Sequence, residues 1–440
     1  MHRLLLFIFL SHIIPLTIQA AETQLRVGLS STDVTPRVQD QIPLGGFGSL
    51  ERRNWPPHLF HYPFLRTFRI AQGKLDPIRV KSMYLVREDS KLLFVSLDVI
   101  GISNKMRLDL IRRLKHTGIP DSNIIISATH THSGPGGLSD NFFWQIFAMD
   151  RYQKRFYEKY MAAIVKTIMV SVHNTQPAEL FTLSYATSEL LNNRRGSNRP
   201  IDPTANFLMA RNLHGEWLGG LVNYAVHGTS LGAANLLFSS DAPGSIEREM
   251  EQFLAQENGS VRLSNYPQVL FLNGAEGDIS PKHDQIKMGK DFVTQTISHW
   301  NEITPQTESW QVLQQKVYVG KPVIKLKKCV NESWIPKNLK VGVKRFVSNT
   351  TIINQIHFGP LWLMTWPGEP TTELGLQLKQ MAKDSGAQTA WVLGLTNDHL
   401  AYFTSPEEYE TGGYESCVNF FGPDGAKKII QAHQNLSLSK

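Results

Sequence analysis

Residues 123–137 read NIIISATHTHSGPGG, and this stretch combines a short apolar segment, two histidines and a glycine-rich turn. The three isoleucines at 124–126 are typical of a buried strand. His130 and His132 follow directly, and the Gly-Pro-Gly-Gly sequence after them marks a turn. α/β proteins place their active sites at such strand ends, where loops hold side chains at the edge of a cleft. The two imidazoles therefore predict a metal ligand, a proton-transfer group or both.

An apolar strand followed by a polar loop with glycine or proline recurs along the chain, and a helix often follows the loop. Strands are expected at residues 25–36 with their turn, 80–85, 92–97, 123–128, 178–187, 217–225, 268–272, 361–366 and 389–395, with antiparallel strands throughout 310–365. Helices are expected at residues 106–115, 142–172, 245–256 and from about 371 to 383. This alternation predicts the α/β class, with a mixed sheet covered by helices. No linker or repeat interrupts the sequence, so we expect one large domain or two fused lobes.

Three of the expected strands end close to a residue that can bind a metal ion. His130 and His227 each follow an apolar strand, and Glu369 comes after the strand at 361–366. If these strands are neighbours, the three side chains meet at one end of a sheet. A catalytic zinc takes His, Asp or Glu ligands and lowers the pKa of water bound at its open position. Each residue alone also has a structural explanation, as a hydrogen-bonded histidine or a helix cap, and their joint occurrence favours a metal site.

The second histidine of the opening stretch has two interpretations. If the strand continues, His132 points to the same side as His130, because side chains alternate along a strand. Both rings can then bind one ion, or one binds while the other transfers protons, and the spacing leaves both open. The sequence has no HExxH motif, which excludes the standard metalloprotease assignment.

A serine and an arginine loop are further candidates for the site. Ser280 lies in the sequence GDISP, which lacks the GxSxG spacing of a nucleophile elbow, so a turn or cap is its ordinary role. Metal-free catalysis by Ser280 stays an alternative. Arg194, Arg195 and Arg199 share one polar loop. A solvated loop is the ordinary explanation, whereas an arginine beside a metal site suits the stabilisation of an oxyanion.

The first twenty residues predict a secretory signal peptide, and hence a secreted or periplasmic protein. Arg3 precedes an apolar core, and Ala20 offers a small residue for cleavage, with Ala21 as the next choice. Pro15 interrupts the apolar run, which is short for a membrane-spanning anchor. The mature domain is then residues 21–440.

Charge and cysteine content limit the classes of partner. The net charge of +7 is a mild excess for 440 residues, and no dense run of Lys and Arg predicts nucleic-acid binding. An anionic membrane surface is compatible with this balance. Cys329 and Cys417 are the two cysteines, and they form either one bridge or two separate thiols.

Five motifs, taken together, resemble those of the neutral ceramidases, and they occur in that family's order. They are SATHTHSGPGG (127–137), NYAVHGTS (223–230), NGAEGDISP (273–281), PGEPTTELG (367–375) and LTNDHLAYFTSPEEYETGGYE (395–415). Neutral ceramidases are zinc amidases that cleave the N-acyl bond of ceramide to give sphingosine and a fatty acid. The resemblance implies their catalytic-domain fold, one zinc ion per chain and a lipid amide substrate, with no nucleic acid or protein partner.

The resemblance also implies a role for each site residue. The residues that match the family's zinc ligands are His130, His227, Glu369 and Tyr402. His132 matches the histidine that transfers protons beside the metal, and Arg194 and Tyr414 match residues that line the site. Arg195 is adjacent, so either arginine fits that position. Ser280 matches a serine that has been treated as a nucleophile.

Several departures from the family pattern leave the substrate open. Residues 32–36 read TDVTP where the family has DITGP, His399 replaces a usual tyrosine, and Lys282 and His283 follow GDISP in place of asparagine. The chain also ends soon after Tyr414, without room for the immunoglobulin-like C-terminal domain typical of the family. We expect hydrolysis of ceramide or a related lipid amide. The alternatives are the same chemistry on another N-acyl amide or an ester, and a binding protein that has lost turnover.

Overall fold

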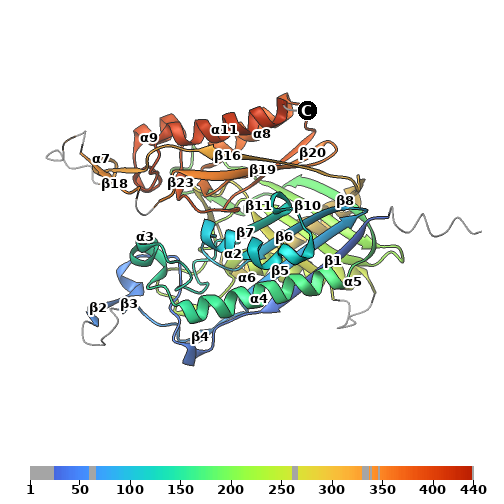
Figure 1. The fold of residues 1–440 in the computed structure, drawn as a ribbon, viewed down its shortest axis with the longest axis horizontal. Helices are drawn as coiled ribbons and strands as arrows, with labels where there is room; N and C mark the ends of the chain where they lie inside the picture. Colours follow the sequence, from blue (N-terminus) through green and yellow to red (C-terminus); the bar gives the residue numbers. More distant parts are fainter. Residues whose placement is uncertain are drawn as a thin grey trace, which may run out of the picture.

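The computed structural model describes residues 24–58, 66–259, 266–329, 336, 339–344 and 347–438. The expected signal peptide, residues 1–20, lies outside this range. The described chain forms four layers, in which two β-sheets pack face to face and helices cover the outer face of each sheet (Figure 1). Within the described chain, none of the helices is both long enough and apolar enough to span a bilayer.

The larger sheet is mixed and has nine strands in the described part of the chain, in the order β13-β11-β10-β8-β1-β5-β6-β7, with β15 paired to β8. These strands are β1 (Arg26–Asp33), β5 (Arg79–Arg87), β6 (Ser90–Leu97), β7 (Ile124–Ala128), β8 (Gln176–Ala186), β10 (Thr204–Asn212), β11 (Trp217–Tyr224), β13 (Gln268–Asn273) and β15 (Thr304–Gln306). The pairs β6–β7 and β11–β13 are parallel. Their carboxyl ends carry the first two candidate metal ligands.

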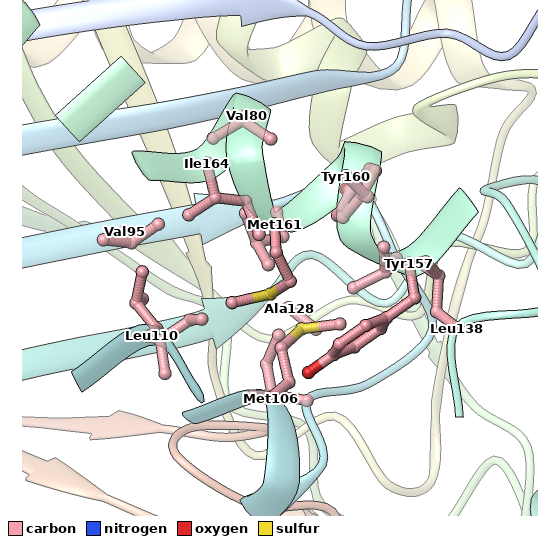
Figure 2. Packing of buried hydrophobic residues seen from close by; sticks show 14 of the residues in the cluster. Val80, Val95, Met106, Leu110, Ala128, Leu138, Tyr157, Tyr160, Met161 and Ile164 are labelled. Carbon is pink, nitrogen blue, oxygen red and sulfur yellow. The ribbon is translucent and has the colours of Figure 1, made fainter. Parts of the chain in front are cut away.

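The outer face of the larger sheet is covered by four helices. They are α2 (Asn104–Leu114), α4 (Lys154–His173), α5 (Asp241–Glu257) and α6 (Gln285–His299). All five residues of β7 are buried, as expected for a parallel strand that is covered on both faces. Figure 2 shows the packing of α2 and α4 on this sheet, where Met106, Met161 and Ile164 belong to one buried cluster with the strand residues Val80 and Val95. This core fixes the position at which β7 ends.

The smaller sheet has four strands in the described chain, in the order β16-β19-β20-β22. These are β16 (Gln311–Tyr318), β19 (Thr350–Phe358), β20 (Leu361–Thr365) and β22 (Thr389–Leu393), and they are covered by α8 (Thr372–Asp384) and α11 (Pro423–Leu438). Leu85 and Ile125 of the larger sheet share a fully buried core with Leu363 and Trp391 of the smaller one. The expected mixed sheet with helices is confirmed, but it consists of two stacked sheets.

Short elements surround the ends of both sheets. They are β2 (Arg53–His58), β3 (Arg66–Phe68), β4 (Gly73–Lys74), β9 (Leu191–Asn193), β12 (Leu237–Phe238), β14 (Ile279–Pro281), β17 (Val323–Lys325), β18 (Lys340–Gly342), β21 (Glu369–Pro370), β23 (Tyr402–Phe403), α3 (Phe142–Trp144), α7 (Leu326–Cys329), α9 (Pro406–Thr411), α10 (Tyr414–Cys417), the π-helix η5 (Gln145–Met149) and the 3₁₀ turns η1 (Val38–Asp40), η2 (Leu50–Arg52), η3 (Lys115–Thr117), η4 (Asp121–Asn123) and η7 (Trp300–Glu302). A disulfide joins Cys329 to Cys417, which decides between the two alternatives for the cysteines.

One expected helix is interrupted. Residues 142–172 are largely helical, as predicted, but α3 and η5 end before α4 begins, and Asp150 between them has a left-handed φ of 56°. The carbonyls of Ala148 and Met149 accept hydrogen bonds from Gly46 and Gly137 at 2.7 and 2.6 Å. These bonds tie the interrupted segment to the loop that carries the two histidines, and such tertiary contacts are invisible to helical periodicity.

Candidate metal centre

The chain turns sharply directly after β7, so the strand does not continue through the two histidines. β7 ends at Ala128, and His130 has a left-handed φ of 67°, which is uncommon for a residue with a side chain. The argument from strand alternation is therefore wrong for His132, although the two rings do converge, with 3.3 Å between their Nε2 atoms. Unusual backbone angles of this kind are concentrated at functional sites.

Backbone carbonyl groups fix the orientation of His130. Its amide donates to the carbonyl of Val99 at 3.1 Å, and its Nδ1 lies 2.6 Å from the carbonyl oxygen of Ile100. A carbonyl only accepts, so Nδ1 carries the proton and Nε2 presents a lone pair. This is the usual arrangement behind a histidine that binds a metal ion.

His227 has the same arrangement at the end of β11. Its Nδ1 donates to the carbonyl of Glu276 at 2.8 Å, which leaves Nε2 as the free lone pair. The loops after β7 and β11 also pair directly, because the amide of His132 donates to the carbonyl of Gly228 at 2.9 Å. The rings of His130 and His227 consequently lie 4.6 Å apart.

The carboxylate and the phenol come from segments that follow the strands of the smaller sheet. β21 and β23 form a parallel pair in which Glu369 is the register partner of Tyr402. Glu369 Oε2 lies 3.2 Å from His130 Nε2 and 3.3 Å from His227 Nε2. The Tyr402 hydroxyl lies 3.1 Å from His227 Nε2. The expected ligands thus meet between two sheets, and not at one end of a single sheet.

This donor set fits a metal ion. Glu369 Oε2 is buried and receives no hydrogen bond with acceptable geometry, although two imidazole nitrogens face it. Both of those nitrogens present lone pairs, so a cation between the three atoms satisfies all of them. One group of side chains with this spacing is His130, His132 and His227, and another is His130, Glu276 and Glu369. Imidazole nitrogen with carboxylate oxygen is a donor set that suits zinc.

Burial keeps the imidazoles of His132 and His227 neutral and therefore ready to bind. It lowers the pKa of His227 to about 4, with a further contribution from the charge of Arg194. Burial also lowers the pKa of His132 well below its ordinary value, and the neighbouring His130 and His227 add to this effect. Burial raises the pKa of Glu369, but the histidines around it outweigh that effect and hold its pKa well below the usual range. An anionic carboxylate among neutral imidazoles is the protonation state that a divalent cation requires.

The predicted arginine and the second tyrosine lie beside this cluster. Arg194 Nη2 donates to the Tyr402 hydroxyl at 3.1 Å, while its Nε donates to Glu415 at 2.8 Å. Arg195 turns away and binds Glu415 and backbone carbonyls, so Arg194 is the arginine that reaches the cluster. The Tyr414 ring lies 5.5 Å from that of Tyr402 and lines the adjoining cavity.

Ser280 is placed differently from the other predicted residues. It lies in β14, opposite Asn192 of β9, and it is absent from the described residues that line the cavity. The structure therefore brings together His130, His132, His227, Glu369, Tyr402, Arg194 and Tyr414, but not Ser280.

Two residues at the cluster were not predicted. His399 Nε2 lies 2.9 Å from Glu369 Oε1, and its ring stacks on Trp144 at 4.5 Å. Glu276 is fully buried, neither of its carboxylate oxygens has a hydrogen-bond partner, and burial together with the charge of Glu369 raises its pKa well above the usual value. Both residues follow apolar strands in polar loops, the same signal that identified His130 and Glu369.

A cavity of about 640 Å³ opens onto the cluster. Apolar side chains line most of it, including Phe143, Trp144, Phe147, Ile324, Leu326 and Phe420. The Gly-rich loop at residues 43–48 closes one side, where a Cβ on Gly46 would lie 2.7 Å from His132 Cα. Gly46 has a φ of 120°, which only glycine adopts readily. This loop therefore packs directly against His132, and Phe47 contacts the same ring at 4.5 Å.

The fold and this cluster define an α/β protein with a buried histidine–carboxylate cluster, spaced as candidate metal ligands, at the end of an apolar cavity. The sequence profile "Neutral/alkaline non-lysosomal ceramidase, N-terminal" matches residues 26–298 and 284–431. The chain belongs to this family, as the sequence motifs predicted.

Individual relatives and solved structures agree with this assignment. The chain is 26% identical to a neutral ceramidase of Pseudomonas aeruginosa in an alignment 280 positions long, which covers 60% of this chain and 38% of that protein. It is 25% identical to a neutral ceramidase of Mycobacterium tuberculosis in an alignment 434 positions long, which covers 76% of this chain and 66% of that protein. The crystal structure of the Pseudomonas aeruginosa neutral ceramidase superimposes with a TM-score of 0.77 at 19% identity, covering 95% of this chain and 74% of that one. A structure titled "Ceramidase complexed with C2" superimposes with a TM-score of 0.74 at 19% identity, covering 95% of this chain and 75% of that one.

Proposed function

We propose that this protein is a zinc-dependent amide hydrolase that cleaves the N-acyl bond of ceramide or of a closely related lipid amide. The observation that carries the proposal is the meeting of His130 Nε2, His227 Nε2 and the unpartnered Glu369 Oε2 at the end of a large apolar cavity. Membership of the ceramidase family supports the same substrate class.

Four residues would hold the ion, with His130, His227 and Glu369 as the principal ligands and Tyr402 completing the set. The ion, when bound, supplies a Lewis acid that polarises a carbonyl group and lowers the pKa of water. Burial and the charge of Glu369 raise the pKa of Tyr402 well above its ordinary value, so its phenol stays protonated until a cation approaches. The Arg194 guanidinium beside the hydroxyl opposes this rise and favours an oxygen that binds metal.

The cavity positions the substrate, whose two hydrocarbon chains require apolar contacts. A volume of about 640 Å³ falls in the range of small-molecule sites, and aromatic and aliphatic side chains make up most of the lining. The polar atoms converge at one end, beside His130 and Arg194. The lipid chains therefore lie along the cavity while the amide group lies at the cluster, and closure around the chains excludes water from the reacting bond.

His132 is the residue that moves protons. Its Nε2 lies 3.3 Å from that of His130, its Nδ1 has no hydrogen-bond partner among the described residues, and its low pKa keeps the ring neutral. A neutral imidazole can accept the proton of the attacking water and then give it to the leaving amine. Phe47 and Gly46 pack on the ring and hold it in one orientation. Arg194 and the Tyr414 hydroxyl are placed to stabilise the negative charge that develops on the amide oxygen.

We also propose that residues 1–20 direct export and that the remainder acts as one catalytic unit outside the cytoplasm. The Cys329–Cys417 bridge supports this, since disulfides persist in oxidising compartments. Determination of the N-terminal sequence of the mature protein tests the cleavage site. A start at Ala21 is expected, and an intact Met1 would contradict export by this signal.

Metal analysis of the purified protein, paired with a substrate screen, tests the proposed function. One zinc ion per chain is expected, together with hydrolysis of ceramide in preference to N-acyl amino acids and esters. Hydrolysis of another amide or ester, without hydrolysis of ceramide, would contradict ceramide as the substrate. Full metal content without any turnover would favour a binding protein. The Ser280→Ala variant distinguishes the metal-dependent mechanism from nucleophilic attack by Ser280. Loss of activity with zinc retained would support attack by that serine.

A further inference from the structure

The basic character of this protein is concentrated in one segment. Residues 321–347 contain seven lysines and one arginine against a single glutamate, a net charge of +7 that equals the net charge of the whole chain. The described part of this segment carries Lys321, Lys325, Lys327, Lys328, Lys340 and Lys344, and it carries no acidic residue. The other parts of the chain are neutral in sum.

The described part of this segment forms one wall of the cavity mouth. Ile324 and Leu326, in β17 and α7, line the cavity together with Cys329. Val341 of β18 is the direct register partner of Ile324, so both side chains lie on the same face of the β17–β18 pair. Val341 is 46% exposed and Leu339, two residues earlier, is 43% exposed. The apolar lining of the cavity thus continues outward onto the surface of this segment.

The opposite wall of the mouth exposes apolar side chains as well. Phe142, Ile146 and Phe147 of α3 and η5 are 58%, 38% and 52% exposed, and Phe147 also lines the cavity. Figure 1 shows α3 and the α7–β18 segment projecting at the same end of the molecule, away from the helices that cover the sheets. We call Phe142, Ile146, Phe147, Leu339, Val341 and the six lysines the mouth rim.

We propose that the mouth rim docks on an anionic lipid bilayer, so that the cavity opens directly into the membrane surface. The inference rests on the proposed function, because it supplies the route by which a lipid amide enters the cavity. Large apolar side chains of this kind insert at the boundary between headgroups and acyl chains, and neighbouring lysines are attracted to anionic headgroups. Lysine stems also lie along apolar surface while their ammonium groups reach the headgroups.

The positive charge of the mouth rim favours an anionic bilayer over a second copy of the chain. A second copy of the chain would bring its own lysines against these, whereas a bilayer with acidic lipids offers the complementary charge. One acidic neighbour is present, because Lys328 pairs with the exposed Glu410 at 3.1 Å. Lys321, Lys340 and Lys344 are exposed, and none of them forms an ion pair with another described residue.

Vesicle sedimentation with the full-length protein tests the proposal without requiring turnover. The vesicles contain phosphatidylcholine alone, or phosphatidylcholine with roughly a third phosphatidylglycerol, whose surface potential attracts lysine. We expect about tenfold or stronger binding to the anionic vesicles, and weaker binding in high salt. Equal binding to both vesicles would overturn the charge contribution, and no binding to either would overturn the proposal.

Two variants locate the surface. Lys340→Glu with Lys344→Glu is expected to weaken binding to anionic vesicles by about tenfold or more, since each lysine near the surface contributes several-fold. Its control, Lys166→Glu with Lys290→Glu on α4 and α6, makes the same change in net charge away from the cavity lining. Equal losses in the two double variants would overturn the assignment to the mouth rim.

The second variant removes apolar surface. Ile146→Ser is expected to weaken binding severalfold on both vesicles, whereas Ile297→Ser on α6, which is also exposed, leaves it unchanged. A protein that is dimeric without vesicles, and monomeric after Ile146→Ser, would show that a second copy covers the rim and would overturn the proposal.

Hydrolysis of a water-soluble short-chain amide distinguishes this proposal from the proposed function. The rim variants should retain that activity and lose hydrolysis of ceramide in anionic vesicles. Retained vesicle binding without any hydrolysis would refute the proposed function alone. Hydrolysis of the soluble amide without vesicle binding would refute the docking surface alone.

Discussion

The nine-stranded sheet supplies three imidazoles to the candidate site, whereas the segments after the four-stranded sheet supply a carboxylate and a phenol. The two sets of donors are also held in different ways. The carbonyls of Ile100 and Glu276 orient His130 and His227, so only the backbone is needed. Glu369 is oriented by the side chain of His399.

This difference shows which part of the site depends on side-chain identity. Because backbone carbonyls orient the two imidazoles, these two hydrogen bonds do not depend on the identity of the neighbouring side chains. The carboxylate loses its support with a single substitution of His399. The site also depends on the contact between the sheets, because neither sheet alone carries a complete set of ligands.

The largest expected effect comes from removing one ligand on each side of this contact. His130→Ala and Glu369→Ala should each lose the metal ion and reduce hydrolysis to background, because both sheets are required for binding. Metal content by mass spectrometry and turnover of a soluble amide measure the two effects. A His130→Ala protein with full zinc and full activity would show that the metal lies elsewhere.

His132 belongs to the same sheet as two of the ligands but has a different expected role. His132→Ala should retain zinc while activity falls by about 10²–10⁴-fold, the usual contribution of general acid–base catalysis. The paired measurements of metal content and rate separate it from His130. Loss of zinc equal to that of His130→Ala would make His132 a ligand.

The disulfide acts on the cavity wall beside the smaller sheet, away from the ligands. Cys329→Ser with Cys417→Ser should lower the free energy of unfolding by about 2–4 kcal/mol, because the bridge closes a long loop. Denaturant unfolding measures the change. Zinc content and hydrolysis of a soluble amide should persist at low temperature, and their loss in the folded variant would show that this wall also shapes the metal centre.

His399 tests the side-chain support directly. His399→Phe retains a ring to stack on Trp144 but removes the hydrogen bond to Glu369, and we expect metal affinity to fall about 10–100-fold. Competition with a chelator measures the affinity, and thermal unfolding of the metal-free protein provides the control for folding. An unchanged affinity would show that Glu369 needs no such support.

The cores of the two sheets should also respond differently to acid. His433, in α11 against the smaller sheet, is fully buried, and burial lowers its pKa to about 4 from an ordinary 6.5. The unfolded chain therefore binds a proton between these values while the folded chain does not, so stability falls as the pH drops through this window. The expected loss is about 2 kcal/mol at pH 5 relative to pH 8.

The larger sheet instead buries Lys81 with Glu247 and Glu251, at 3.0 and 2.6 Å. Burial raises the pKa of Glu251, but the charges of Lys81 and Arg79 outweigh burial and lower the pKa. The ionised Glu251 therefore stabilises the fold at neutral pH, and this stabilisation is lost only below about pH 4.5. Unfolding of His433→Gln across pH 5–8 measures the difference, and its stability should vary less than that of the wild type. An identical pH dependence would contradict the assignment to His433.

The sequence identified most strands and the residues that converge, because both signals are local. Apolar runs followed by His130, His227 and Glu369 could be read without knowledge of neighbours. The division into two sheets could not, since strand order depends on contacts between distant segments. The left-handed conformation of His130 also escaped prediction, because it depends on the hydrogen bonds of His130 to Val99 and of His132 to Gly228 and not on the preference of the residue itself.

Two further properties could not be predicted: the local concentration of positive charge and the role of His399. A net charge of +7 looked mild over the whole chain, yet it is concentrated in residues 321–347. His399 was noted as a departure from the family pattern, and its role became apparent only from its contact with Glu369. The family motifs supplied Tyr402 and Tyr414, which no spacing argument had selected.

Anomalous diffraction at the zinc absorption edge, from crystals of the purified protein, is the decisive measurement of the proposed metal site. We expect one peak per chain between His130 Nε2, His227 Nε2 and Glu369 Oε2, with the Tyr402 hydroxyl nearby and His132 outside the coordination shell. The absence of a peak between these atoms, or a peak bound by His132 in place of Glu369, would contradict the proposed site.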